Sequence, residues 1–169
     1  MIVTPTKPVY VVDTNIWVGL VPFTPTLLPD LWKLLAGLAD AGRLVVPEEV
    51  VRETFPTAHA TRWLHDRKDI QRPTAPVWET ACQIADRYPS LVKRGQPSSW
   101  ADPFLIATAT VEKRNSDATL WPRNYVVVTN EKRKAGRIAI PDSCDAEGIP
   151  CVDMEGWFAL EGWKFGVEP

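Results

Sequence analysis

The sequence predicts an α/β fold of three layers, in which helices cover both faces of a mostly parallel central sheet of four to five strands. Short apolar runs rich in β-branched residues alternate along the chain with longer amphipathic segments. This alternation is typical of parallel strands joined by helical crossovers. The chain has 169 residues, 45% of them hydrophobic, which is the size of one ordinary domain with room for a core. We therefore expect a single domain over residues 1–169.

Short apolar runs are the predicted strands. The first is Val9-Tyr10-Val11-Val12, β-branched and aromatic, and it closes on Asp13. The predicted strands cover residues 9–13, 44–46, 69–72, 125–129 and 150–152, of which the third is the weakest pattern.

Helices are predicted in the intervening segments. Between the first two strands, leucines recur at helical spacing and Gly42 marks the end. Pro47 stops the second strand and can begin a helix, and Pro76 has the same place in a later helix. The predicted helices cover residues 27–42, 48–54, 57–67, 76–88, 99–113 and 154–165, with a loop between 89 and 99.

Composition excludes several classes of protein. No apolar stretch approaches the roughly 20 residues that span a bilayer, and the N-terminus lacks the apolar core of a signal peptide. We therefore expect a cytoplasmic protein with no membrane partner. Cys82, Cys144 and Cys151 are odd in number and lack C-x-x-C spacing, so we expect reduced thiols and no disulfide framework or thiolate zinc site. With a net charge of −2, any nucleic acid must be held by local basic patches.

Two acids follow predicted strands. Asp13 ends the first strand, and Glu131 follows the strand at 125–129. An Asp after a strand is commonly an Asx turn, and Glu131 can simply balance the cations beside it. However, the carboxyl edge of an open α/β sheet is also where ligands bind. Two acids at that edge favour a site more strongly than either does alone.

Three further acids, two of them alternatives to each other, lie in the predicted helices that follow. Asp102 stands in the first turn of helix 99–113, where capping is worth about 0.5–2 kcal/mol. A carboxylate there can also project toward a cation. Glu49 and Glu53 are four residues apart beyond the second strand and so share a helix face. Either glutamate can supply an acid to the same edge.

Convergence of these acids would require a cation. Two like charges about 4 Å apart repel by roughly 4 kcal/mol at an effective dielectric constant near 20. Oxygen ligands without Cys or His favour Mg²⁺ or Mn²⁺ over zinc. Such a site suits phosphoryl chemistry, because the metal neutralises phosphate charge and lowers the pKa of bound water.

Three motifs resemble those of the PIN-domain ribonucleases. They are Val-Val-Asp13-Thr-Asn, Ala-Asp102-Pro-Phe-Leu-Ile-Ala-Thr-Ala and Val-Val-Thr129-Asn-Glu131. The acid that follows the second predicted strand is a further point of resemblance. The resemblance covers nearly the whole chain. The Leu-Trp-Lys-Leu-Leu helix, residues 140–144 and the Gly162-Trp163-Lys164-Phe165 tail resemble an uncharacterised PIN-like subgroup of bacteria and archaea.

The resemblance implies a single PIN-like domain and a Mg²⁺- or Mn²⁺-dependent endoribonuclease. Such proteins are often VapC-like toxins of type II toxin-antitoxin systems, each neutralised by a cognate antitoxin protein, and they often form homodimers. By motif position, Asp13, Glu53 and Asp102 carry over as metal-binding acids. Glu131, where Asp is more usual, carries over as the fourth acid, and Glu49 remains the alternative to Glu53.

Supporting and RNA-binding residues complete the expected site. Asn15 matches a small polar residue that supports the first acid, Asp13. Thr129 lies two residues before the fourth acid, Glu131, and is expected to support the site as well. An RNA substrate would need cations beside the acids, although a charge run is usually a solvated face. The candidate phosphate-binding cations are Lys93, Arg94, Lys132, Arg133, Lys134 and Arg137.

Rival functions differ in their sequence markers. A non-catalytic PIN-like module that binds RNA or an antitoxin is the main alternative, and its marker would be the loss of one or more acids. A haloacid-dehalogenase-type phosphatase needs a second Asp where this chain has Asn15. A nucleotide-binding module is disfavoured because neither G-x-G-x-x-G nor G-x-x-x-x-G-K-[ST] occurs.

Overall fold

The computed structural model describes residues 7–92 and 100–165, which contain one five-stranded sheet of order β3-β2-β1-β4-β5. Every neighbouring pair of strands is parallel. The strands are β1 (Val9–Val12), β2 (Leu44–Pro47), β3 (Gln71–Arg72), β4 (Tyr125–Val128) and β5 (Cys151–Val152). This topology, with helices on both faces, confirms the predicted α/β class.

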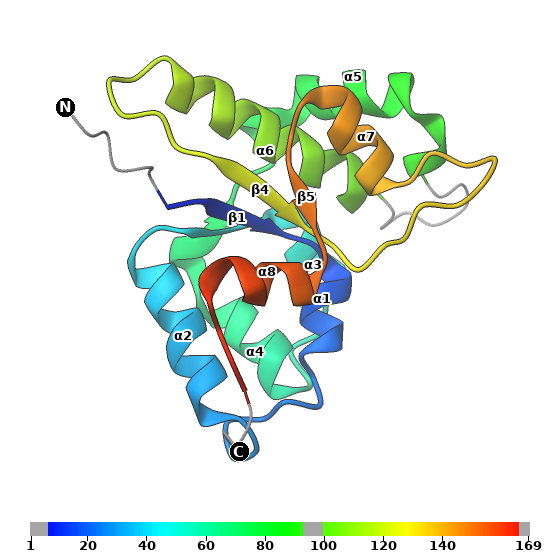
Figure 1. The fold of residues 1–169 in the computed structure, drawn as a ribbon. Coiled ribbons are helices and arrows are strands. Elements are labelled where there is room, and N and C mark those ends of the chain that lie inside the picture. Colours follow the sequence, from blue (N-terminus) through cyan, green and yellow to red (C-terminus); the bar gives the residue numbers. More distant parts are fainter. Residues whose placement is uncertain (1–6, 93–99, 166–169) are drawn as a thin grey trace.

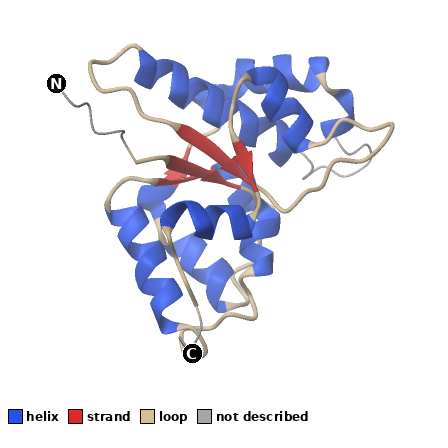
Figure 2. Cartoon of the chain, in the orientation of Figure 1, coloured by secondary structure: helices blue, strands red, loops and turns tan. Residues whose placement is uncertain are grey.

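Helices form the two outer layers (Figures 1 and 2). One layer contains α1 (Thr14–Gly19), α2 (Pro29–Asp40), α4 (His59–Asp66) and α8 (Met154–Glu161). The other contains α5 (Trp78–Arg87), α6 (Ala101–Asp117) and α7 (Ile140–Glu147), while the short α3 (Glu48–Arg52) directly follows β2. Within the described ranges, no helix has the length and apolar character needed to cross a membrane.

The core lies on both faces of the sheet. All four residues of β1 are fully buried, as are Val127 and Val128 of β4. Strands of a parallel sheet covered on both faces read as continuous apolar runs, which explains why β1 and β4 were the clearest strands in the sequence. α6 packs against β4 and carries a run of buried side chains from Phe104 to Ala109.

Two helices of the structure were not predicted. α1 has only six residues, too few for a hydrophobic period, although Asp13 at its N-cap accepts a hydrogen bond from the Thr14 amide. α7 has eight residues, and its signals were Pro141 near its start and Gly148 in the left-handed conformation just after its end. Both helices follow a strand directly or through a loop, and both contribute to the site described below.

Helix boundaries differ from the predictions at several ends. The helix predicted over 99–113 is observed as Ala101–Asp117, and its N-cap is Trp100, without a side-chain capping bond. Asp102 therefore lies inside the first turn and is not the N-cap residue. The third strand is shorter than predicted, because Lys68–Ile70 forms a 3₁₀ turn before Gln71.

A buried ion pair anchors α8 near the amino ends of β1 and β2. The Arg43 guanidinium donates hydrogen bonds to both carboxylate oxygens of Glu161, one of them over 3.1 Å, and to the carbonyl oxygen of Pro8 over 3.0 Å. The Tyr10 hydroxyl donates to Oε1 of Glu161 over 2.6 Å. The side chains of Arg43 and Glu161 are each only 11% exposed. This contact fixes the last helix against the sheet.

Candidate functional site

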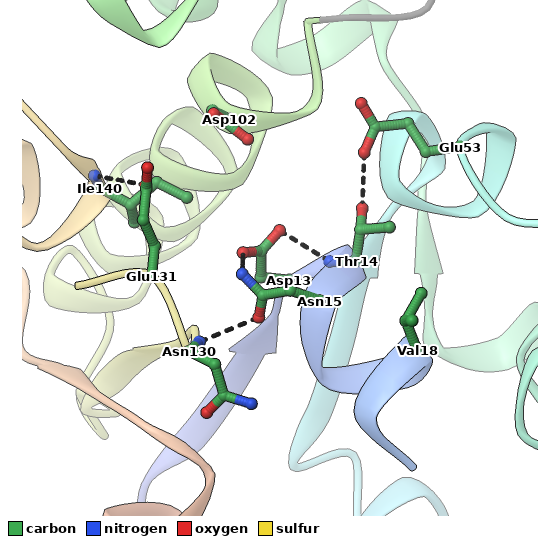
Figure 3. A pocket seen from close by; sticks show the side chains of 9 residues that line it. All are labelled: Asp13, Thr14, Asn15, Val18, Glu53, Asp102, Asn130, Glu131 and Ile140. Carbon is green, nitrogen blue, oxygen red and sulfur yellow. Dashed lines mark hydrogen bonds between the residues drawn. The ribbon is translucent and has the colours of Figure 1, made fainter. Parts of the chain in front are cut away.

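A cavity of about 390 Å³ lies at the carboxyl ends of β1 and β4 (Figure 3). Its lining is mostly acidic and polar. The lining residues are Asp13, Thr14, Asn15, Val18, Glu53, Asp102, Asn130, Glu131 and Ile140. Four carboxylates predicted from the sequence thus share one cavity, although they come from the ends of two strands, the end of α3 and the start of α6.

Asp13 lies at the base of this group and is only 3% exposed. Its Oδ1 accepts a hydrogen bond from the Thr14 amide over 2.7 Å. Its Oδ2 accepts from Nδ2 of Asn15 and from the Thr129 hydroxyl, both over 2.6 Å. Three donors therefore hold the carboxylate in one orientation, as Figure 3 shows for the first two.

The pKa of Asp13 is raised to about 6. Burial is the largest cause, and the negative charges of Glu53 and Glu131 raise it further. The hydrogen bonds from Thr129 and the Thr14 amide act in the opposite direction. The charged form of Asp13 is thus disfavoured by its surroundings, and a cation in the cavity would relieve that penalty.

Asn15 and Thr129 connect the ends of β1 and β4. Nδ2 of Asn15 donates to the Thr129 hydroxyl over 3.0 Å, and its Oδ1 accepts from the Asn130 amide over 2.9 Å. The Thr129 hydroxyl also accepts from the Glu131 amide over 3.1 Å. The two residues expected to support the site are therefore the residues that join Asp13 to the segment carrying Glu131.

Glu53 and Glu49 have different surroundings. Glu53 lines the cavity, and its Oε2 accepts a hydrogen bond from the Thr14 hydroxyl over 2.7 Å. Glu49 instead accepts from the Thr74 hydroxyl over 2.8 Å and pairs with Arg52 over 2.5 Å. Of these two alternatives, the structure brings Glu53 to the cavity, and Glu49 is absent from its lining.

Asp102 and Glu131 face the cavity from the side of α6 and α7. Figure 3 shows Asp102 in the first turn of α6, across the cavity from Asp13. Oε2 of Glu131 accepts a hydrogen bond from the Ile140 amide over 3.0 Å, and its Oε1 lies 3.9 Å from the Arg137 guanidinium. Glu131 consequently also fixes the start of α7.

The donor set fits a hard divalent cation in its chemistry, because it is composed of oxygens and contains one strongly desolvated carboxylate. In the arrangement of residues 7–92 and 100–165, however, no three His, Cys, Asp or Glu side chains are grouped closely enough to hold a metal ion. Glu53 and Glu131 are instead engaged by Thr14 and by the Ile140 amide.

Four lining residues were not predicted: Thr14, Val18, Asn130 and Ile140. Thr14 and Asn130 directly neighbour Asp13 and Glu131 in the recognised motifs, so their position in those motifs was an available signal. Val18 follows Thr14 by one helical turn, but α1 itself was not predicted. Ile140 begins α7 and had no signal in the sequence beyond the proline that follows it.

The predicted phosphate-binding cations are mostly paired with acids. Lys132 bonds to Asp153 over 2.8 Å. Arg133 bonds to Asp142 and Asp145, each over 2.6 Å. The Arg137 guanidinium reaches the Ser90 carbonyl oxygen over 3.4 Å, and Lys134 is exposed. Lys93 and Arg94 lie outside the described residues. The surface beside Glu131 is therefore mixed in charge and does not form a purely basic patch.

Comparison with known sequences gives one family. A family model described as a domain of unknown function, DUF4411, matches residues 10–165. The matched range includes every residue that lines the cavity. A search of curated proteins found no match.

Proposed function

The chain belongs to the DUF4411 family, and we propose that it is a PIN-like, Mg²⁺- or Mn²⁺-dependent endoribonuclease. The proposal extends to a role as the toxin of a type II toxin-antitoxin system, with RNA as substrate and an antitoxin protein as partner. The motifs around Asp13, Asp102 and Glu131 support the PIN-like part. The chemistry of the cavity supports the metal-dependent hydrolase part.

One observation carries this proposal: four carboxylates from distant parts of the chain line one cavity, and the most buried of them has a pKa raised to about 6. Clustered acids without a cation are destabilising, since each desolvated charge repels the others. Perturbed acids in a cavity are common at functional sites. A purely structural role would leave this repulsion uncompensated.

In the proposed reaction, Asp13, Glu53 and Asp102 would hold the metal and Glu131 would orient the attacking water. A bound Mg²⁺ or Mn²⁺ would supply neutralisation of phosphate charge and a lower pKa of water. The chain's own contribution is orientation. Asn15, Thr129 and the Thr14 amide hold Asp13, while the Thr14 hydroxyl holds Glu53.

The cations beside Glu131 would contact the phosphates of the RNA. The ion pairs of Lys132 and Arg133 are exposed, with 72% and 54% of the cationic side chains accessible. Exposed pairs of this kind are worth only about 0–1 kcal/mol. RNA phosphates can therefore compete with Asp153, Asp142 and Asp145 for these cations.

The test compares purified wild type with Asp13→Asn and Asp102→Asn on a panel of RNAs in Mg²⁺, Mn²⁺ or EDTA. Loss of one charged group at the reacting centre is expected to lower the cleavage rate by about 100-fold or more. Glu53→Gln should act in the same way. Glu49→Gln is the matched control, because it makes the same chemical change four residues away and outside the cavity.

Equal cleavage by wild type and Asp13→Asn would contradict the proposed centre and assign the activity to a contaminant. Among the described residues, the acids are not grouped closely enough to hold a metal ion. This observation favours one alternative, a non-catalytic module that binds RNA or an antitoxin. That alternative predicts RNA binding by wild type without cleavage in either metal.

A further inference from the structure

Glu53 reaches the cavity from the end of a very short helix. α3 has five residues, and Glu53 is its C-cap. A helix of this length is not stable by itself, so its end depends on contacts from outside the helix. The Thr14 hydroxyl holds the Glu53 carboxylate. The backbone at Glu53 needs its own anchor, because a long side chain is placed only as well as the backbone that carries it.

The residue after Glu53 provides that anchor. Thr54 is 6% exposed, and its amide and hydroxyl both donate to the Val51 carbonyl oxygen, over 3.1 and 2.9 Å. Nε2 of His65, on α4, lies 3.0 Å from the Thr54 carbonyl oxygen and 3.0 Å from the Thr54 hydroxyl oxygen. One imidazole nitrogen thus contacts both the backbone and the side chain of Thr54.

The direction of these bonds follows from the chemistry of the partners. A carbonyl oxygen can only accept, so Nε2 of His65 must carry the proton. The Thr54 hydroxyl gives its own proton to the Val51 carbonyl oxygen, so it also accepts from Nε2. The result is one donor shared between two acceptors of the same residue. Such a shared bond restrains the Thr54 peptide and its side chain together.

His65 itself stands on a fixed base. The Gln71 side-chain amide donates to the carbonyl oxygens of Leu64 and His65, over 2.9 and 3.4 Å, and so ties the end of α4 to β3. Leu64 is fully buried. The restraint on Thr54 therefore comes from a packed helix and not from a mobile loop. His65 does not line the cavity, so any effect on the acids must pass through another residue.

We propose that His65 is a positioning residue for Glu53, which it keeps at the cavity by holding Thr54. The inference rests on the proposed function, because it matters only where Glu53 is a metal-binding acid. Glu53 is then restrained from two sides. The Thr14 hydroxyl fixes its carboxylate, and the imidazole of His65 fixes the turn that carries its backbone.

A purely structural role for His65 makes a different prediction. In that case its loss lowers stability, and the folded variant still binds metal as wild type does. A positioning role instead lowers the metal affinity of the folded protein. It also makes the effect of His65 depend on the Glu53 carboxylate, which a double-mutant cycle measures directly.

The experiment measures Mn²⁺ affinity by isothermal titration calorimetry in wild type, His65→Gln and His65→Asn. Gln can bring its amide nitrogen close to the position of Nε2, whereas Asn is shorter and cannot reach Thr54. We expect His65→Asn to bind Mn²⁺ about 10-fold more weakly than wild type, at the low end for residues that orient a ligand. His65→Gln should keep most of the wild-type affinity.

The cycle repeats His65→Asn in a Glu53→Gln background, where it should change the affinity by less than about 2-fold because the charge that His65 positions is gone. His59→Asn is the matched control, since His59 lies on the same helix and its Nε2 has no hydrogen-bond partner among the described residues. It should bind Mn²⁺ like wild type. Thr54→Val removes only the hydroxyl half of the contact, so it should weaken binding by a smaller factor and decides the question where His65→Asn does not fold.

Equal affinity in wild type, His65→Asn and Thr54→Val would overturn the positioning role and leave the metal site intact. Equal losses for His65→Asn in both backgrounds would also overturn it, because the effect would not pass through Glu53. Absence of Mn²⁺ binding by wild type would instead contradict the proposed function, and the role of His65 would fall with it.

Discussion

The Thr14 hydroxyl donates a 2.7 Å hydrogen bond to Oε2 of Glu53 and thereby joins the start of α1 to the C-cap residue of α3. The backbone amide of Thr14 also donates a hydrogen bond to Oδ1 of Asp13. One threonine thus orients two carboxylates of the cavity. In a metal site, a side chain that orients a ligand typically affects affinity or activity by 10- to 100-fold.

We predict that Thr14→Val weakens Mn²⁺ binding about 10-fold, because the hydroxyl is lost while the backbone bond to Asp13 stays. Thr14→Ser keeps the hydroxyl and should bind Mn²⁺ like wild type. Isothermal titration calorimetry measures both. Equal affinity in Thr14→Val and wild type would show that the Glu53 contact has no part in metal binding.

A second prediction concerns stabilisation by metal. A ligand that binds only the folded state at 100 times its Kd stabilises that state by about 2.7 kcal/mol. Saturating Mn²⁺ should therefore raise the melting temperature of wild type and of Glu49→Gln. Glu53→Gln and Asp102→Asn should show a clearly smaller increase in melting temperature. Thermal unfolding monitored by circular dichroism measures these temperatures.

These two variants at Glu49 and Glu53 make a sharp comparison. Both remove one charge and both lie at or beside α3, but only Glu53 lines the cavity. If Mn²⁺ stabilises neither wild type nor Glu49→Gln, the carboxylates do not form a metal site, and the metal-dependent function fails with it.

The sheet and the position of Asp13 and Glu131 were predictable from sequence, since both depend on local pattern. Runs such as Val9–Val12 identify buried strands, and parallel strands bring their carboxyl ends to one edge. Asp102 was predictable for a similar reason: it begins a long helix with a clear apolar run. Predicting these positions did not require knowing which side chains contact one another.

The choice between Glu49 and Glu53 was not predictable, because it depends on where α3 ends and on a partner distant in sequence. α3 ends at Arg52, and Thr74, 25 residues after Glu49, accounts for the orientation of that glutamate. The pairing of Arg133 with Asp142 was not predictable either, because it depends on α7, which has too few residues to show a clear hydrophobic period.

A third prediction concerns pH. The folded-state pKa of Asp13 is about 6, above its ordinary value of 3.8. For a raised acid, the stabilising contribution is fully present below pH 3.8 and is lost as pH rises through 6. The loss amounts to about 3 kcal/mol for a shift of this size. Asp69 and Asp142 act in the opposite sense, because hydrogen bonds and then neighbouring cations lower their pKa values.

The difference between wild type and Asp13→Asn isolates the contribution of Asp13. We expect the free energy of unfolding of wild type to fall by about 3 kcal/mol relative to the variant between pH 3 and pH 7, in EDTA. In the variant, the new side-chain amide lies against the Nδ2 donor of Asn15. This contact adds to the difference in unfolding free energy an offset that does not vary with pH. Urea unfolding at several pH values measures the slope, and a flat difference would contradict the raised pKa.

The last prediction concerns the ion pair between Arg43 and Glu161, which is remote from the carboxylates. Both side chains are 11% exposed, so removing one charge leaves the other poorly solvated. We expect Glu161→Gln to lower the free energy of unfolding by about 3 kcal/mol, near the lower end for buried pairs. Tyr10→Phe removes one hydrogen bond to the same carboxylate and should cost about 1 kcal/mol.

Glu155→Gln is the control for the Glu161 variant, since Glu155 is exposed on the same helix and its change should stay within about 0.5 kcal/mol. Urea unfolding at neutral pH measures all three variants. The increase in stability on adding Mn²⁺ should be the same in Glu161→Gln as in wild type, because the pair lies near the amino ends of the strands while the cavity lies at their carboxyl ends. A change in that increase would mean that the docking of α8 and the acid cluster are coupled.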